Sequence, residues 1–505
     1  MSIYYVSTTD GNDSYNGLYP TYQSGNDGPW LTVAKVNSSQ ASFNPGDSIL
    51  FNKGNVWNTG TGDGLLPSKS GSEAGGYITY GAYGTGERPI IQHDSSVDGV
   101  PPIYSWTTGL AYINIENIHA QQTRASGGGS GISFNRTGRN HIKISNCKVS
   151  RTGSSSGVGI GIRYVDTYII EDCIVEPMGS AGILIEGSPA PRATNGTIRR
   201  CIVDGNSDSI SIHDDAGGSG NNPGDNHLIE DCVIGWTTQP IENCIDMGLN
   251  LSDTIPQGIV IRGNSCKGGG AGAMGLNGNG TIVENNFIYY GGNSGWEGLI
   301  VGNGGSNFKI RYNVITNGGE ASAYGLMLTD ASPYNTNVEI YNNVIYNGGN
   351  GTRSALVIYP GDTNITVKNN IVINEVSGYQ CVHFYNEATP TSTNTTLDYN
   401  CYYSSAGDSN QFHANDINYN FANWKSTFSQ DANSKFADPL FVNGSGTYSL
   451  DTDFQIPSNS PAKNAGTNVG LTEDYFGTTV PQGSAPDIGV HEYAESEPIY
   501  LIWTK

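Results

Sequence analysis

Short apolar runs recur along this chain with one shape. A pair of alternating Ile or Val positions precedes a small polar residue and a second apolar pair, as in HIKISNCKVS, HLIEDCVIG and ITVKNNIVI. Such alternation over four to eight residues predicts half-buried β-strands. Aligned on this shape, ten copies place a Cys or an Asn in one column: Cys147, Cys173, Cys201, Cys232, Asn264, Asn286, Asn313, Asn343, Asn370 and Asn400.

The column recurs at intervals between 22 residues (Asn264 to Asn286) and 32 residues (Cys232 to Asn264), and a weaker copy begins the series at Ile118. Periods in this range are typical of leucine-rich repeats or of a parallel β-helix, and the Leu pattern and helical segment of the former are missing here. Each interval also contains a second strand-like run, such as GIGIRY or CVHFY. The sequence therefore predicts an all-β, right-handed parallel β-helix of about 10–11 coils, with three short strands per coil.

The Cys and Asn column has a physical interpretation in this fold. Equivalent residues of successive coils lie about 4.8 Å apart, so buried Asn side chains at a bend can hydrogen-bond along the column, and Cys is a small, weakly polar substitute. We therefore expect free, buried thiols at the four Cys of the column. The sequence does not decide the state of the other four, which are Cys244, Cys266, Cys381 and Cys401.

Both ends of the chain lie outside the regular period. Residues 1–100 contain PWLTVAKVN and FNPGDSILFNKG, which predict one helical turn and the first strands of an N-terminal cap. Residues 101–405 form the coils, and residues 406–505 are expected to close the other end with irregular strands and loops. We expect one structural domain.

Charge and hydropathy disfavour some classes of binding partner. The formal net charge is −22 and the 24 Lys and Arg form no run, so nucleic acid is disfavoured as a partner. No stretch reaches the roughly 20 apolar residues of a membrane span, so we expect no membrane partner. The start, MSIYYVSTTDGND, has no basic region followed by an apolar core, so no signal peptide is expected in the given chain. An extracellular or virion-associated location is expected, whether a signal peptide was removed or another export route is used.

The opening YYVSTTDGNDSYNG, the internal coils and the closing SPAKNAG…DIGVHEY resemble secreted right-handed β-helix proteins of the pectate lyase-like superfamily, nearest to pectate lyase family 9. The resemblance implies the architecture over nearly the whole chain. It implies less about chemistry, because that superfamily includes polysaccharide lyases, glycoside hydrolases, epimerases, phage tailspikes and binding proteins. The catalytic lysine of the family 9 lyases has no match here, since the corresponding strand, CIDMGLN, contains none.

Alternation in the second strand of each coil identifies an outward row, and ionisable groups gather in four consecutive coils. The predicted catalytic residues are Glu186, His213, Asp214, Asp215 and Asp246, with Arg163 beside them. A polar face held by ion pairs is the simpler interpretation. The functional interpretation is a glycoside hydrolase that needs no cofactor, because glycoside hydrolysis uses a pair of carboxyl groups. A separation of about 5–5.5 Å supports retention of configuration, and one of about 6.5–9.5 Å supports inversion. We expect about 9.5 Å between Glu186 and Asp246, from two coils of backbone spacing.

Two other functions remain open. A lyase for uronate-containing glycans would need Ca²⁺, for which Asp208, Asp214, Asp215 and Asp246, with Glu186, are candidate oxygen ligands. Its base would be Arg163 or Lys267, the latter in an expected inter-strand loop. The second open function is that of a non-catalytic glycan-binding or tailspike-like protein.

The expected partner is an extended polysaccharide lying along the outward row. The predicted substrate-binding residues are Arg163, Asn277, Tyr359, His383 and Tyr385, and Trp236 and Trp296 lie in neighbouring loops. The oligomeric state stays open, because a capped solenoid can be a monomer and tailspikes are trimers.

Overall fold

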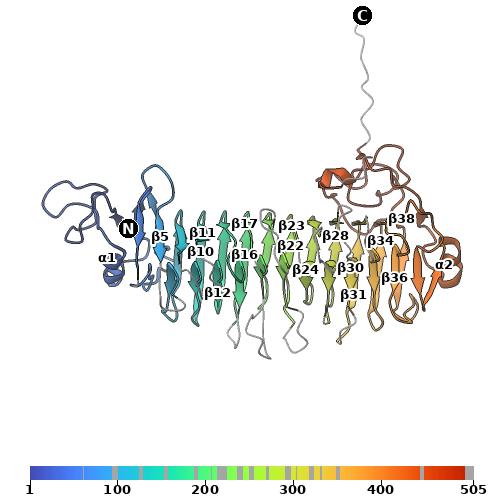
Figure 1. Ribbon diagram of the computed structural model, residues 1–505, viewed down its shortest axis with the longest axis horizontal. Coiled ribbons are helices and arrows are strands. Elements are labelled where there is room, and N and C mark those ends of the chain that lie inside the picture. The colour runs from blue at the N-terminus through green and yellow to red at the C-terminus, as the bar shows by residue number, and fades with distance from the viewer. Residues whose placement is uncertain are drawn as a thin grey trace, which may run out of the picture. The chain divides into compact units, whose positions relative to one another are not determined.

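The computed structural model describes residues 1–60, 62–93, 100–123, 129–152, 157–186, 192–205, 207–212, 224–235, 243–248, 255–268, 272–290, 297–302, 304–317, 324–329, 333–348, 353–443 and 448–494. The chain divides into two compact units, Met1–Thr281 (unit 1) and Ile282–Lys505 (unit 2). In each unit the chain winds through three sheets, which we call sheets I, II and III in the order that a coil passes through them (Figure 1). Their described strands pair in parallel, apart from the last two strands of sheet III in unit 2, which pair antiparallel. The predicted parallel β-helix is confirmed.

Unit 1 begins with the helical turns α1 (Val33–Ser38) and η1 (Gln40–Ser42) among its first strands. Its sheet I contains β1 (Ile3–Val6), β2 (Ser48–Asn52), β4 (Ile78–Tyr83), β7 (Ala111–Glu116), β10 (Arg139–Ser145), β13 (Val165–Glu171), β16 (Thr194–Arg199), β19 (Leu228–Glu230) and β22 (Val260–Arg262). Its sheet II contains β3 (Val56–Asn58), β5 (Ile90–His93), β8 (His119–Gln122), β11 (Lys148–Arg151), β14 (Ile174–Val175), β17 (Ile202–Val203), β20 (Val233–Ile234) and β23 (Ser265–Lys267). Its sheet III contains β6 (Ile103–Ser105), β9 (Ile132–Phe134), β12 (Ile160–Arg163), β15 (Ile183–Glu186), β18 (Ile210–Ser211), β21 (Ile245–Asp246) and β24 (Gly272–Leu276).

Unit 2 repeats the arrangement and adds α2 (Phe421–Phe428) and η2 (Asp451–Phe454). Its sheet I contains β25 (Ile282–Glu284), β28 (Lys309–Arg311), β31 (Thr336–Tyr341), β34 (Thr363–Lys368) and β37 (Thr395–Asp398). Its sheet II contains β26 (Phe287–Tyr289), β29 (Val314–Thr316), β32 (Val344–Asn347), β35 (Ile371–Asn374), β38 (Cys401–Tyr403) and β41 (Lys435–Phe436). Its sheet III contains β27 (Glu297–Val301), β30 (Tyr324–Leu328), β33 (Leu356–Ile358), β36 (Val382–Phe384), β39 (Phe412–Ala414) and β40 (Ile417–Tyr419).

The bend between sheets I and II uses a left-handed residue directly before each rung of the Cys and Asn column. These residues have φ between 49° and 65°, and most are Asn or Asp, whose short polar side chains tolerate this conformation. In unit 1 they are Asn117, Asn146, Asp172, Arg200, Asp231 and Gly263, and in unit 2 they are Asn285, Tyr312, Asn342, Asn369 and Tyr399. The turn directs the next side chain, the rung, into the interior.

The rungs of unit 2 form a hydrogen-bonded ladder, as predicted. The Asn343 amide nitrogen donates to the backbone carbonyls of Ile310 and Tyr341 at 2.8 and 3.0 Å. Its amide oxygen accepts from the backbone and side-chain nitrogens of Asn313 at 2.9 and 3.0 Å. Asn313 and Asn370 repeat this pattern, so each rung satisfies buried backbone groups of two coils.

In the four Cys rungs of unit 1, the thiol takes the place of the Asn amide nitrogen as the donor to two backbone carbonyls. The Cys173 thiol lies 3.7 Å from the Ile144 carbonyl and 3.3 Å from the Glu171 carbonyl, the two positions that an Asn rung would reach. A thiol is a weaker donor than an amide. All eight cysteines are free and buried, which confirms the prediction for the column and extends it to the other four.

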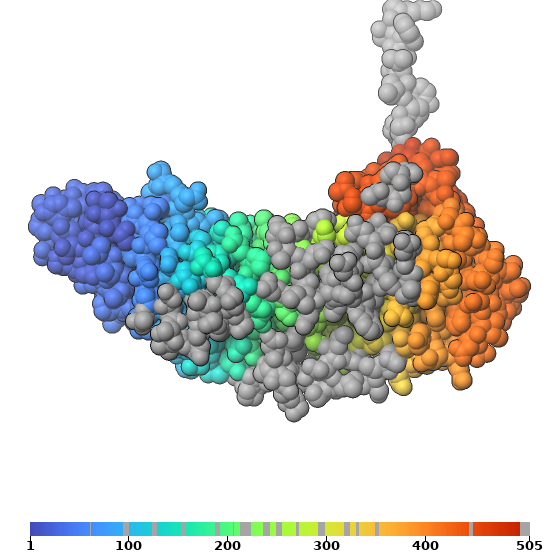
Figure 2. Space-filling model, viewed as in Figure 1, coloured from blue at the N-terminus to red at the C-terminus, as the bar shows by residue number. Residues whose placement is uncertain are grey.

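Both ends of the solenoid carry irregular segments, as expected. In unit 1, α1 begins at the cap Thr32, whose hydroxyl accepts the Lys35 N–H, and lies beside the first strands (Figures 1 and 2, dark blue). In unit 2, the segment after β41 returns along the coils, where Asn342 donates to the carbonyls of Asp487 and Gly489 (Figure 2, red). The sequence analysis missed α2, which is capped by Asn420 and buries Trp424. No helix among the described residues is long and apolar enough to span a membrane.

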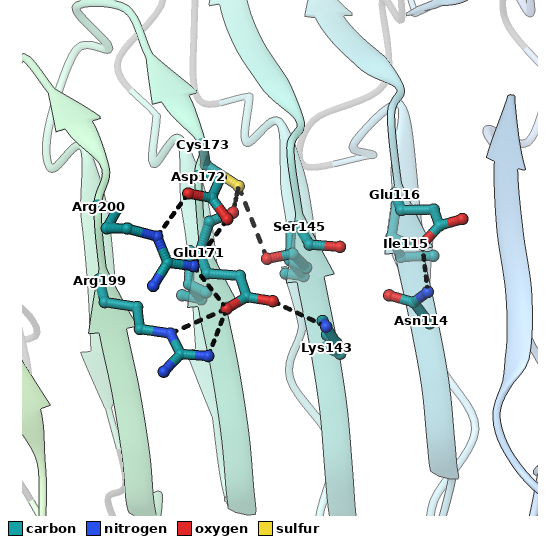
Figure 3. A network of polar contacts seen from close by, with 12 residues as sticks. Asn114, Ile115, Glu116, Lys143, Ser145, Glu171, Asp172, Cys173, Arg199 and Arg200 are labelled. Carbon is teal, nitrogen blue, oxygen red and sulfur yellow. Dashed lines mark hydrogen bonds and ion pairs between the residues drawn. The ribbon is translucent and has the colours of Figure 1, made fainter.

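The outer face of sheet I in unit 1 carries opposite charges on neighbouring strands. The carboxylate of Glu171 lies 2.7 Å from Lys143 on one side and 2.7 Å from Arg199 on the other, with Arg200 at 3.1 Å (Figure 3). Burial raises the pKa of Glu171, but hydrogen bonds and charges from Lys143 and Arg199 outweigh it and lower the pKa from 4.5 to about 2. Because its cations surround it, this carboxylate stabilises the sheet.

We expect Asn343→Ala to destabilise the protein by about 3 kcal/mol or more, because it leaves several buried backbone groups without partners at about 1–3 kcal/mol each. The measurement is the shift of the urea midpoint. Thr366→Ala, on the outer face of β34, serves as control and should change stability by less than about 1 kcal/mol. Equal shifts for the two variants would contradict the role of the ladder.

We expect Glu171→Gln to cost about 1–2 kcal/mol at pH 7. The folded-state pKa lies below the unfolded one, so the ionised carboxylate stabilises the fold above pH 4.5, and this contribution disappears as the pH falls towards 2. The stability difference between wild type and variant should therefore shrink over that range in chemical denaturation. Glu176→Gln removes a more exposed pair with Lys148 and should cost less at every pH.

Candidate functional site

The outer face of sheet III in unit 1 gathers the side chains that the outward row predicted. Strand pairing places Gly161 beside Leu184, Leu184 beside Ser211, and Ser211 beside Asp246. A second row, two residues further along each strand, pairs Arg163 with Glu186. The predicted register of this face is confirmed.

Glu186 and Arg163 form an ion pair across β12 and β15. The Glu186 side chain is only 5% exposed, whereas that of Arg163 is 39% exposed. Asp246, at the end of β21, is half-buried and accepts the backbone N–H of Gly248 at 3.3 Å. A charged pair and a second carboxylate thus share one face.

The separation of the two carboxylates is larger than expected. Asp246 belongs to the row of Leu184, so it is offset from Glu186 by two strands and also by two residues along the strand. The expected 9.5 Å ignored the second offset, and the spacings together put the Cα atoms about 12 Å apart. Two side chains that reach toward each other from such positions suit the wider separation of an inverting pair better than the narrow one of a retaining pair.

Of the other residues predicted for this face, three lie outside the described residues and two are buried. His213, Asp214 and Asp215 lie outside the described residues. Asp208 and Asn277 are buried. Asp208 accepts the N–H of Asn243 at 3.1 Å, and Asn277 accepts the N–H of Gly278 at 2.7 Å.

The described part of the predicted calcium site does not form a metal-binding set. No three His, Cys, Asp or Glu side chains within the described ranges are placed to share a metal ion. Lys267, the alternative base of a lyase, was expected in an inter-strand loop. It is instead the last residue of β23 in sheet II. It therefore belongs to a different sheet from Glu186 and Asp246, and Arg163 is already engaged by Glu186.

The sequence analysis missed residues at the N-terminal side of this face. Trp106 directly follows β6, is 42% exposed, and has the Arg136 guanidinium 4.6 Å from its ring centroid. Its neighbour Tyr104 packs edge-on against it at 5.1 Å. The signal was present, since IYSW precedes the first clear copy of the repeat, but without a rung residue its register was not assigned.

Small and polar side chains lie between Trp106 and the carboxylates. A methyl group added at Gly161 would meet Ser133 and Val158 at 3.8 Å, which is ordinary contact distance, so a small side chain would fit there among the described residues. Asn135 Oδ1 and Ser211 Oγ are buried atoms that have no hydrogen-bond partner among the described residues. Buried polar atoms usually find partners, so Asn135 Oδ1 could accept a hydrogen bond from a ligand, and Ser211 Oγ could donate or accept one.

Sheet III of unit 2 brings together the three aromatic side chains that were predicted to bind substrate. Tyr359 and Tyr385 stack at 4.6 Å, and His383 stacks on Tyr385 at 5.2 Å. Both tyrosines pack against buried neighbours that include Met327. Burial, and then His413, lower the pKa of His383 to about 4, so its ring is neutral near pH 7. The predicted Trp236 and Trp296 lie outside the described residues.

Comparisons with known proteins place this face in a common architecture. XylC, whose structure was determined with xylose, is 11% identical, with 97% of this chain and 99% of that chain covered at a TM-score of 0.53. Pectate lyase Pel9A is 15% identical (97% and 96% covered, TM-score 0.42), and the GH136 lacto-N-biosidase from Eubacterium ramulus is 15% identical (82% and 68% covered, TM-score 0.45). No curated protein matched the sequence.

At these identities the similarity is one of fold. The family model described as the right-handed β-helix region matches residues 93–233 and 241–417, which is more than half of the chain. The chain belongs to the right-handed parallel β-helix family.

Proposed function

We propose that this protein binds an extended polysaccharide along the outer face of sheet III in unit 1 and hydrolyses it, with Glu186 and Asp246 as the pair of catalytic carboxyl groups. The observation that carries the proposal is the strand register, which sets both carboxyl groups on one outer face, two strands apart, with Ser211 on the strand between them.

The character of the face supports a glycan as ligand. Exposed aromatic rings stack on the apolar faces of sugars, and Trp106, which is 42% exposed, supplies such a ring at the end of β6. Ser211 and Asn135 offer buried polar atoms for sugar hydroxyls. XylC, which shares the fold along its whole length, was determined with a bound sugar, xylose, and this similarity adds support of a general kind.

The roles of the two carboxyl groups follow from their surroundings. Glu186 lies against the Arg163 guanidinium, and a nearby cation favours the ionised form of a carboxyl group. Glu186 is therefore assigned as the general base that activates water. Asp246 is assigned as the general acid that protonates the leaving oxygen, and water attacks from the opposite side of the sugar with inversion.

We expect Glu186→Gln and Asp246→Asn each to reduce turnover by about 10²–10⁴-fold, the usual contribution of a general acid or base. The assay follows new reducing ends, and the absorbance of unsaturated uronates, on neutral and uronate-containing polysaccharides with and without chelator. Glu116→Gln removes a carboxylate from sheet I of the same unit and should retain full turnover. Melting temperatures of all variants show whether the fold survives.

Three results would contradict the proposed hydrolysis. Full turnover in both site variants would exclude this carboxyl pair. Chelator-sensitive unsaturated products would show elimination by a calcium-dependent lyase instead. Glycan binding with neither product would show a non-catalytic binding protein.

We expect Trp106→Ala to weaken binding of long substrates more than of short ones, because β6 lies three strands before β15 and only a long chain reaches both. Loss of one stacking ring should raise KM by about threefold to tenfold while kcat stays nearly constant. Tyr334→Ala, an exposed ring in unit 2 that lies outside sheet III, is the control. Equal KM changes for long and short substrates would contradict the placement of the glycan.

A further inference from the structure

A cavity lies in unit 2, on the outer face of sheet II. It has a volume of about 370 Å³. Strands β32, β35 and β38 form one wall, and the segment that follows β41 forms the other. The cavity is lined by Tyr346, Ile373, Glu375, Tyr403, Ser405, Asp438, Phe441 and Tyr448.

Aromatic rings hold the shape of this cavity. Tyr346 and Tyr448 face each other at 4.6 Å with their planes 56° apart, and Phe441 packs edge-on against Tyr448 at 5.9 Å. Phe454, from η2, stacks on Tyr448 at 5.1 Å and also lies 6.2 Å from the ring of Tyr346. The rings are therefore held in place by contacts with one another, and Tyr403 adds a further ring to the lining.

The charge of the lining is negative. Glu375 accepts the backbone N–H and the hydroxyl of Ser405, so its carboxylate is held in place at the wall. Asp438 accepts the Leu440 N–H at 2.8 Å and is exposed. Among the described residues, the lining contains no Lys, Arg or His. Burial raises the pKa of Tyr403 and of Tyr448, and the charges of Asp438 and Glu375 raise it further.

We propose that this cavity binds a small organic cation, an ammonium group on a compact carbon skeleton. Faces of aromatic rings attract such cations, and carboxylates at the wall add direct charge attraction. The volume lies at the lower end of the range of about 300–1,000 Å³ for small-molecule sites, which suits a ligand of the size of choline or an amino sugar.

Other occupants fit less well. A bare metal ion would need several free oxygen ligands, but Glu375 is already engaged by Ser405 and the remaining walls are mostly aromatic. An anionic sugar would meet two carboxylates without a compensating cation in the lining. A neutral sugar could stack on the rings, but it would gain nothing from the two charges.

The test is calorimetric titration of the whole protein at low salt with choline and with 3,3-dimethyl-1-butanol, its neutral counterpart of the same shape. Choline should bind at one site, at least about tenfold more tightly than the alcohol, and its affinity should fall as NaCl is added. Equal affinities for the two ligands, or no saturable binding of choline, would overturn the proposal.

Variants locate the site. Glu375→Gln keeps the shape of the side chain and should lower the affinity for choline by about tenfold. Tyr448→Phe keeps the ring and should retain binding, whereas Tyr448→Ala should lose it. Glu339→Gln, a carboxylate on sheet I of the same unit, is the matched control. Unchanged affinity in Glu375→Gln, or an equal loss in Glu339→Gln, would refute the assignment.

The site is independent of the proposed hydrolysis. Glu186→Gln lies in unit 1 and should bind choline with wild-type affinity even where polysaccharide turnover is lost. Loss of choline binding in that variant, with an unchanged melting temperature, would contradict the independence of the two sites.

Discussion

Hydrogen bonds from the rung side chains to the backbone of two successive coils hold each unit in register. An asparagine rung such as Asn343 donates to one carbonyl of its own coil and one of the preceding coil, and it accepts a backbone N–H from that preceding coil. The left-handed residue before each rung makes this possible, because it turns the chain sharply and points the rung inward. A slip by one residue would bury polar side chains and expose the apolar ones, so the ladder decides which face every other side chain occupies.

The functional proposals depend on this register. Arg163, Glu186, Ser211 and Asp246 are far apart in the sequence, and stacking alone brings them to one face of sheet III. The segments between the strands vary in length without disturbing that alignment, because loop length costs little free energy once the strands are paired. Solenoids can thus change their surface chemistry while the core stays constant.

The two outer faces of unit 1 carry their charges differently. On sheet I, Glu171 is surrounded by Lys143, Arg199 and Arg200, and the charges cancel between neighbouring strands. On sheet III, Glu186 has one cation, Arg163, and the exposed ring of Trp106 lies on the same sheet. Ionisable residues on a strand therefore need their neighbours on adjacent strands before a role can be assigned.

The sequence by itself determined the repeat, the three strands per coil, the rung column with its buried thiols, and the outer face that contains Glu186 and Asp246. These follow from alternation and spacing, which are local properties. Only the tertiary structure decided the burial of Asp208 and Asn277 and the aromatic cavity of unit 2. The cavity depends on an irregular segment that folds back on the coils and places Tyr448 against Tyr346, and the spacing of the repeat carries no information about such a contact.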